Sequence, residues 1–198
     1  MRAPDGCALV LASASPRRAD LVRQIGLTPA RTDPAEIDES PRRSERPRVY
    51  AERMAGQKAQ AVAVRHTGCW VLAADTVVAC GLRILPKAEA EREARQCLEL
   101  LSGRRHRVIG GIALVAPDGS IRTRVVETRV EMKRLEQREI AAYLASGQWH
   151  GKAGGYAIQG LAAAYITLVN GSYSNVVGLP LAETYGLLTG VGFRHAGD

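Results

Sequence analysis

The chain has 198 residues, of which 46% are hydrophobic and 24% charged, and its formal net charge is +7. This length and balance are typical of a soluble globular protein, so we expect one domain with a substantial core over residues 1–198. No apolar run approaches the roughly 18 residues that a membrane span needs, which excludes a membrane-spanning protein.

The net charge and the cysteines indicate which partners and which cellular compartment to expect. A positive charge suits polyanionic partners, which include nucleic acid, a membrane surface and phosphorylated small molecules. The arginines are scattered and the single Phe offers no stacking platform, which weakens the nucleic-acid interpretation. The four cysteines show no Cys-x-x-Cys spacing, and the first residues lack the apolar segment of a signal peptide. These features predict a protein of the reducing cytoplasm.

The first predicted elements are a buried strand over residues 8–12, a turn at Ser13–Ser15 and a helix that begins at Pro16. The turn brings backbone N–H groups, two hydroxyls and the guanidiniums of Arg17 and Arg18 to one point. Such a group is typical of a phosphate site. The alternative is an ordinary strand, turn and helix with two solvated arginines.

Further along the chain, strands and helices alternate. We expect a long polar loop at 28–48, followed by helices over Pro47–His66, 88–101, Leu135–Ser146 and after Pro180. We expect strands over Cys69–Ala74, Val77–Leu85 (a hairpin), Val108–Ala116, Ile121–Met132, Ala162–Val169 and near Val176. The second helix would bury a small apolar side formed by Val49, Ala55, Ala59, Val62 and Ala63. Because several hairpins occur, the pattern predicts an α/β fold with a mixed sheet rather than a doubly wound parallel one.

Asp75 stands where the apolar run Cys69–Ala74 gives way to polar residues, a frequent place for a metal ligand or general base. Glu36, Asp38 and Glu39 in the polar loop could share a divalent metal with it. Mg²⁺ takes one or two carboxylates and completes its shell with phosphate and water. The alternatives are a turn-capping Asp and a solvated acidic loop.

Lysine is rare in this chain and occurs at Lys58, Lys87, Lys133 and Lys152 among 27 basic residues. A lysine in such a background indicates either a need for a compact ammonium or a surface residue whose stem lies along apolar atoms. The loop before Lys152 is one residue short of a Walker A motif, and no Ser or Thr follows the lysine, so that motif is excluded. No dinucleotide-binding glycine motif follows a strand, and the four histidines lack metal-ligand spacing.

Gln159 lies in the glycine-flanked segment Gly155–Gly160. Its amide offers donors and an acceptor, so it can pair with the edge of a base. The alternative is a glycine-rich turn with a polar tip.

Several segments, covering about residues 8–190, occur in the order found in one known family. They are LASASPRR from Leu11, IDES from Ile37, the pair Lys58-Ala59, AADTVV from Ala73, Lys87, LSGRRHRV from Leu101, KAGGYAIQG from Lys152 and NGSYSNVVGLPL from Asn170. Together they resemble the Maf family of nucleoside triphosphate pyrophosphatases.

The resemblance implies a mixed α/β fold with a twisted sheet flanked by helices, similar to the inosine triphosphatase-like enzymes, and a nucleotide cleft between two lobes. It implies hydrolysis between the α- and β-phosphates with a divalent metal, Mg²⁺ or Mn²⁺, giving a nucleoside monophosphate and pyrophosphate. The Tyr156–Gly160 and Gly171–Asn175 signatures resemble the dTTP/UTP branch. The 7-methyl-GTP branch has Ser-Phe-Lys-x-Glu-Gly in place of the first. Modified pyrimidine nucleotides remain open as substrates.

Carried over by position, Asp75 would accept a proton and would bind the metal together with Glu39. The resemblance implies that phosphates are held by Ser13, Arg17, Lys58 and Lys87, and that specificity is set by Arg17, Thr76 and Gln159. We include Lys152 among the expected substrate-binding residues.

Three positions depart from the family's pattern: Gly151 where Asp is usual, Ala88 where Pro is usual, and Gly110 where Thr is usual. The missing Asp could lower the rate or loosen the loop around Lys152. The main triphosphate-site residues remain, so activity is still expected.

A non-catalytic nucleotide- or partner-binding regulator of cell division is the alternative function, because the family's name derives from an association with septum formation. The retained set Asp75, Glu39, Lys58 and Lys87 favours the enzyme, since a pure binder needs no water-activating carboxylate. We expect a nucleoside triphosphate as partner, no nucleic acid and no membrane, with a homodimer as a candidate assembly.

Overall fold

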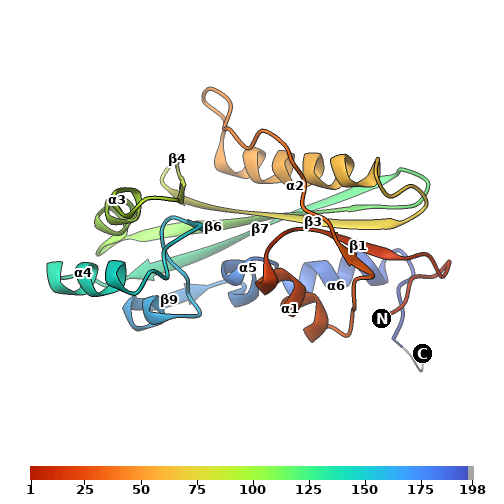
Figure 1. The fold of residues 1–198 in the computed structure, drawn as a ribbon. Helices are drawn as coiled ribbons and strands as arrows, with labels where there is room; N and C mark the ends of the chain where they lie inside the picture. The colour runs from red at the N-terminus through yellow and green to blue at the C-terminus, as the bar shows by residue number, and fades with distance from the viewer. Residues whose placement is uncertain (196–198) are drawn as a thin grey trace. The chain divides into compact units, whose positions relative to one another are not determined.

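The structure is a computed structural model that describes residues 1–195 (Figure 1). The chain forms two compact units, called unit 1 and unit 2 below. Unit 1 comprises residues 1–75, residues 110–126 and the chain from residue 178 onward, and unit 2 comprises residues 76–109 and 127–177. The expectation of one domain over residues 1–198 stays a prediction, and its last residues, 196–198, lie outside the described chain.

The strands form one large sheet and one small ribbon. The sheet strands are β1 (Leu9–Ala12), β2 (Arg31–Thr32), β3 (Trp70–Cys80), β4 (Arg83–Leu85), β6 (Arg105–Val115), β7 (Ile121–Met132) and β9 (Ile166–Asn170). Within the described residues their order is β2-β1-β3-β6-β7-β9, with β4 paired to β3. Strand β1 runs parallel to β2 and β3, whereas β4 is antiparallel to β3 and β9 to β7. The predicted mixed sheet is confirmed.

The helices begin where the local chemistry favours them. They are α1 (Pro16–Gln24), α2 (Pro47–Ala63), α3 (Glu91–Leu101), α4 (Gln137–Ala145), the 3₁₀ helix η1 (Leu161–Tyr165), α5 (Tyr173–Val177) and α6 (Leu181–Thr189). A proline occupies the first turn of α1 and of α2, where a missing N–H costs no hydrogen bond. Before α3, the Glu93 carboxylate accepts the backbone N–H groups of Glu89 and Ala90. No helix in residues 1–195 is long and apolar enough to cross a bilayer.

The core of unit 1 consists of small side chains. All four residues of β1 are buried, and Leu9 to Ala12 pair with Trp70 to Ala73 in parallel register. Helix α2 packs on this layer through Ala55, Ala59 and Val62, which are fully buried. The helix also comes close to β6, because a Cβ on Gly111 would overlap the carbonyl oxygen of Ala51. Small residues at this contact therefore set how near α2 lies to the sheet.

The predicted apolar side of α2 is correct except at Val49. Ala63 is partly buried against the same cluster, but 54% of Val49 is exposed. Buried positions recur at Ala51, Ala55 and Ala59, and at 100° per residue Val49 lies about 120° around the helix from Ala55, the middle of these three positions. The error follows from counting apolar residues without fixing the phase of the helix.

Three other elements differ from the prediction. Strand β3 does not end at Asp75 but continues to Cys80. The segment predicted as a strand from Ala162 begins as η1, with the Ala163 N–H bonded to the Gly160 carbonyl, and becomes extended only at β9. The segment near Val176 is helix α5 rather than a strand, and the hydroxyl of Ser172 accepts the Asn175 N–H at its start.

We predict that Gly111→Ala destabilises the protein by about 1–3 kcal/mol, because the added methyl group forces α2 away from β6. Gly56→Ala on the same helix is the matched control. Its new Cβ would meet nothing nearer than Ile121 Cδ1 at 4.0 Å, so we expect a gain of about 0.4–1 kcal/mol. Urea unfolding measures both changes, and equal effects of the two variants would contradict close packing at Gly111.

Candidate functional site

The turn after β1 is held together by its own side chains. The Ser13 hydroxyl accepts the Ser15 N–H at 3.1 Å and Arg18 Nη1 at 3.3 Å. Arg18 Nε donates to the carbonyl oxygen of Gly178 at 2.9 Å. Ser15 is the N-cap residue of α1, but its side chain makes no cap hydrogen bond. Ser13 and Arg18 thus shape the turn that presents the N-terminus of α1.

A group of three charged side chains, two of them buried, lies in the same unit. Lys58, which α2 contributes, places Nζ 2.6 Å from Asp75 Oδ1 on β3 and 2.9 Å from Glu39 Oε1 in the loop before α2. Asp75 is 3% exposed and Lys58 is 6% exposed. One ammonium therefore joins two carboxylates that lie 36 positions apart in the printed sequence. We call these three residues the carboxylate–lysine cluster.

The turn and the carboxylate–lysine cluster influence each other electrostatically. Burial lowers the pKa of the Arg18 guanidinium below its ordinary value, and the negative charge of Asp75 opposes this shift. Arg17 lowers the same pKa further, whereas Glu39 raises it. The guanidiniums and the carboxylates are therefore neighbours within unit 1, which the sequence suggested only through separate motifs.

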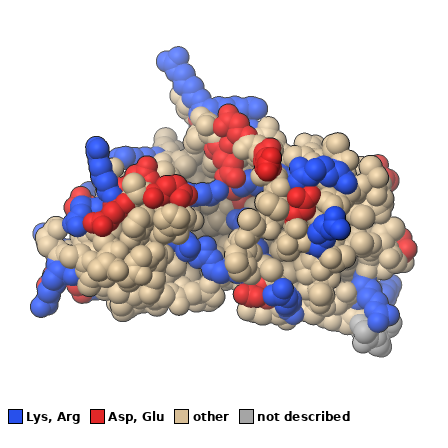
Figure 2. Space-filling model, viewed as in Figure 1, with Lys and Arg blue, Asp and Glu red and all other residues tan. Residues whose placement is uncertain are grey.

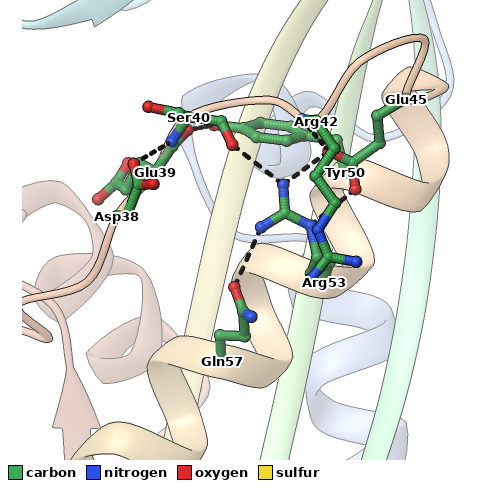
Figure 3. A network of polar contacts seen from close by, with 8 residues as sticks. All are labelled: Asp38, Glu39, Ser40, Arg42, Glu45, Tyr50, Arg53 and Gln57. Carbon is green, nitrogen blue, oxygen red and sulfur yellow. Dashed lines mark hydrogen bonds and ion pairs between the residues drawn. The ribbon is translucent and has the colours of Figure 1, made fainter.

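The loop that carries Glu39 is fastened to α2 by a polar network (Figure 3). The Tyr50 hydroxyl donates to the Glu39 carbonyl oxygen at 2.6 Å. Arg53 contacts Glu45 through two nitrogens, at 2.7 and 2.6 Å, and also donates to the Ser40 carbonyl at 3.2 Å. Burial, and then the charges of Asp75 and Glu39, raise the pKa of Tyr50, so its hydroxyl stays a donor.

Sequence reasoning missed this network. Tyr50, Arg53 and Gln57 occur at spacings of three and four, which places them on one face of a helix, and Gln57 Oε1 accepts Arg53 Nη1 at 3.1 Å. That spacing was a usable signal. The partner Glu45 could not be identified, because a loop residue has no periodicity.

The donor set of the carboxylate–lysine cluster suits a divalent cation. Asp75 and Glu39 already share one cationic atom, Lys58 Nζ, and Mg²⁺ or Mn²⁺ can bind through two carboxylates with phosphate and water as its other ligands. Glu36 and Asp38 are exposed, and Asp38 accepts the Ser40 N–H at 2.9 Å. No group of three or more acidic, His or Cys side chains in residues 1–195 is arranged to hold a metal by itself.

Unit 2 carries the other predicted residues. Thr76 follows Asp75 on β3 and is half-buried, and Gln159 is exposed. Lys87 and Lys152 belong to a two-stranded ribbon of β5 (Lys87–Ala88) and β8 (Lys152–Ala153), in which Lys87 opposes Ala153 and Ala88 opposes Lys152. Since opposed residues share a face and successive residues alternate, the two lysines lie on opposite faces of the ribbon.

The structure around Lys152 shows how the loop accommodates Gly151, at the position where Asp is usual in the family. The Lys152 ammonium donates to the His150 carbonyl at 2.9 Å. Gly151 has φ +65°, in the region that favours glycine, and a Cβ there would meet no atom within 4 Å. The glycine therefore fits its backbone conformation, and its presence strains nothing in the loop.

Charged side chains are mixed rather than segregated on the surface in view. Figure 2 shows separate groups of Lys and Arg beside groups of Asp and Glu. Exposed ion pairs among the described residues include Arg23–Asp20 at 2.7 Å and Arg105–Glu131 at 2.6 Å. Some of the arginines are thus exposed charges with nearby acidic partners.

Comparison with known proteins identifies the family of this chain. Residues 8–191 match the family model described as Maf-like protein. The chain belongs to the Maf family. Among similar curated Maf proteins, the dTTP/UTP pyrophosphatase of Paramagnetospirillum magneticum is 66% identical over 93% of this chain and 97% of its own length. That of Caulobacter vibrioides is 62% identical, with coverage of 96% and 98%.

The Maf chain also overlaps a solved structure of different sequence. The Ham1 protein of Staphylococcus aureus is 17% identical, with a TM-score of 0.46 over 63% of this chain and 71% of that one. The family expected from the sequence motifs is therefore confirmed by the family model and the curated relatives.

The Arg53–Glu45 ion pair, which holds the Glu39 loop against α2, predicts how the stability of the protein depends on pH. Hydrogen bonds from Arg53 lower the pKa of Glu45 from 4.5 to about 2. A depressed carboxyl pKa contributes stability that is complete above the unfolded value and is lost as the pH falls through the folded value. We expect Glu45→Gln to destabilise the Maf protein by about 1–3 kcal/mol at pH 7, and this difference should shrink as the pH falls from 4.5 toward 2.

Thermal or urea unfolding at several pH values measures the difference. Asp20→Asn, which removes the exposed Arg23–Asp20 pair on α1, is the control and should change stability little. A Glu45→Gln penalty that stays constant down to pH about 2 would contradict the linkage to this carboxyl group.

Proposed function

We propose that this Maf protein hydrolyses dTTP and UTP between the α- and β-phosphates and releases a nucleoside monophosphate and pyrophosphate. The observation that carries the proposal is the carboxylate–lysine cluster, in which Asp75 and Lys58 are buried and which shares unit 1 with the turn at the N-terminus of α1. The names of the curated relatives, dTTP/UTP pyrophosphatase, support the substrate pair.

Asp75 is the proposed proton acceptor for the attacking water. Its carboxylate is oriented by Lys58, and its position inside a strand allows little movement of the backbone. A general base must be held within hydrogen-bond reach of the proton it removes, so a carboxylate fixed in this way is suited to the role. A divalent cation bound by Asp75 and Glu39 would neutralise phosphate charge.

The turn at Ser13–Arg17 is the proposed triphosphate site within unit 1. The N-terminus of α1 offers backbone N–H groups and the positive end of the helix dipole, both of which favour phosphate. Arg17 and Lys58 would add full positive charges. Lys87 and Lys152 of unit 2 are proposed as phosphate-binding residues in their own unit. Because they lie on opposite faces of the ribbon, we do not assign both of them to the same phosphate group.

Base selection is the proposed role of Arg17, Thr76 and Gln159. The amide of Gln159 can offer an acceptor and two donors to a pyrimidine, whose N3–H and neighbouring carbonyl match them. The exposed position of Gln159 leaves its amide accessible to a ligand. Modified pyrimidine triphosphates would present the same edge and are part of the proposed substrate class.

We predict that the purified protein, supplied with Mg²⁺ or Mn²⁺, converts UTP to UMP and dTTP to dTMP with pyrophosphate as the other product. Chromatographic separation of the products from a panel of nucleoside triphosphates measures this. Release of orthophosphate and a nucleoside diphosphate would overturn the bond assignment, and preference for 7-methyl-GTP would overturn the substrate assignment. Tight binding without turnover would instead favour a nucleotide-binding regulator.

We predict that Asp75→Asn lowers turnover by roughly 10²–10⁴, because the amide cannot accept the proton. The change is nearly isosteric, so the fold should persist, which circular dichroism can verify. Asp118→Asn in the β6–β7 turn, where Asp118 accepts the Ser120 N–H at 2.8 Å, is the control and should leave turnover unchanged. Full activity of the Asp75→Asn enzyme would remove this residue from the mechanism.

A further inference from the structure

Unit 2 contains a buried histidine–tyrosine pair that the proposed reaction does not use. His106 on β6 and Tyr156 are 2% and 6% exposed. His106 Nε2 lies 2.7 Å from the Tyr156 hydroxyl, and the two rings meet edge to face with centroids 5.4 Å apart. Burial lowers the pKa of His106 to about 4, so the imidazole is neutral near pH 7. The pair is therefore a neutral hydrogen bond inside the core.

Tyr156 begins the loop that carries Gln159. A hydrogen bond from the backbone to a side chain holds this loop near each of its ends. The residue after Tyr156, Ala157, donates its N–H to the hydroxyl of the fully buried Tyr143 at 3.0 Å. At the other end, the Leu161 N–H donates to Gln148 Oε1 at 2.7 Å. Gln159 thus lies between two fixed points of the backbone.

The two residues before Tyr156 pack closely against neighbouring elements of unit 2. Gly154 and Gly155 have φ +66° and +68°, and a Cβ on Gly154 would lie 2.7 Å from Val78 Cγ1 on β3. A Cβ on Gly155 would lie 3.1 Å from Ala94 Cα on α3. The backbone therefore rests directly on β3 and α3, and the side chain of Tyr156 leads from this contact into the core.

From these contacts we propose that His106 and Tyr156 are positioning residues for base selection, which hold the Gln159 loop in the orientation that reads the pyrimidine. The inference rests on the proposed function, because it assigns Gln159 the task of contacting the base. A hydrogen-bonding site distinguishes the correct base from a wrong one only when its polar groups are held in place. A wrong base then leaves polar groups unpaired, which costs binding energy, whereas a mobile amide can turn to pair with either base. Neither residue would take part in phosphate cleavage.

The test compares UTP with CTP, whose ring presents a different hydrogen-bonding edge. Tyr156→Phe keeps the ring and removes the hydroxyl, and we expect it to lower the ratio of kcat/KM for UTP over CTP by about tenfold, mainly through KM for UTP. His106→Leu should have the same effect. His106→Gln, whose amide can take the place of Nε2, should restore most of the ratio.

Two further variants separate positioning from a general structural role. Tyr165→Phe removes the hydroxyl of another tyrosine of unit 2 that is also 6% exposed, and it should leave the ratio unchanged. In a Gln159→Ala background, Tyr156→Phe should lower the ratio no further, because both changes act on the same contact. An additive loss in the double variant would contradict action through Gln159.

Amide hydrogen exchange of residues 157–161 gives a readout that does not depend on activity. We expect faster exchange there in Tyr156→Phe, with β7 unchanged. An unchanged ratio, an equal loss for UTP and CTP, or unchanged exchange in a folded Tyr156→Phe or His106→Leu enzyme would overturn the inference. Absence of UTP hydrolysis by the unaltered protein would instead contradict the proposed function.

Discussion

The contact of Lys58 with Asp75 and Glu39 is the interaction on which the rest of the site depends. Removing a carboxylate or an ammonium from water costs several kcal/mol, so buried charges persist only with partners in good geometry. Here one ammonium satisfies two carboxylates that come from a strand and a loop. The positions of α2 and β3 are therefore linked, because displacement of either would leave the buried charge of Lys58 or Asp75 without this partner. Glu39, whose side chain is 34% exposed, adds a second contact to Lys58.

Helix α2 uses different faces to pack on the sheet, to hold the Glu39 loop and to place the Lys58 ammonium. Ala51, Ala55 and Ala59 recur every four residues and let the helix approach the sheet closely. Tyr50 and Arg53 hold the loop that delivers Glu39. Lys58 belongs to the same helix, so the distance that the small alanines allow also brings its ammonium within reach of Asp75. The close packing of the small alanines on α2 therefore also places the charge of Lys58 next to Asp75.

The sequence was sufficient for features that depend on neighbouring residues. The strand, turn and helix around Pro16, the β6–β7 hairpin and the helix that follows Pro180 all follow from local patterns and turn chemistry. The sequence was insufficient for features that depend on contact with a residue far away in the chain. Asp75 was expected at the end of a strand because the apolar run Cys69–Ala74 gives way to polar residues there, yet the Lys58 ammonium contacts its carboxylate and β3 continues.

The same limit applies to the site. Motifs predicted that Lys87 and Lys152 are important, but only strand register shows that they lie on opposite faces of a ribbon. Val49 was misplaced because the phase of a helix is set by what it packs against. The His106–Tyr156 bond joins residues 50 positions apart, and no periodicity in either segment predicts such a pairing. Residues whose importance comes from one distant contact were the ones that sequence reasoning missed.

The division of the chain into segments has a consequence for synthesis on the ribosome. Every residue of unit 2 has been made once residue 177 is complete, whereas unit 1 still lacks the chain from residue 178 onward. Gly178, whose carbonyl receives Arg18, is 160 positions from its partner. Contacts between such distant residues form late, because a long loop must close first. The turn at Ser13 therefore leaves the ribosome among the first segments and is among the last to be completed.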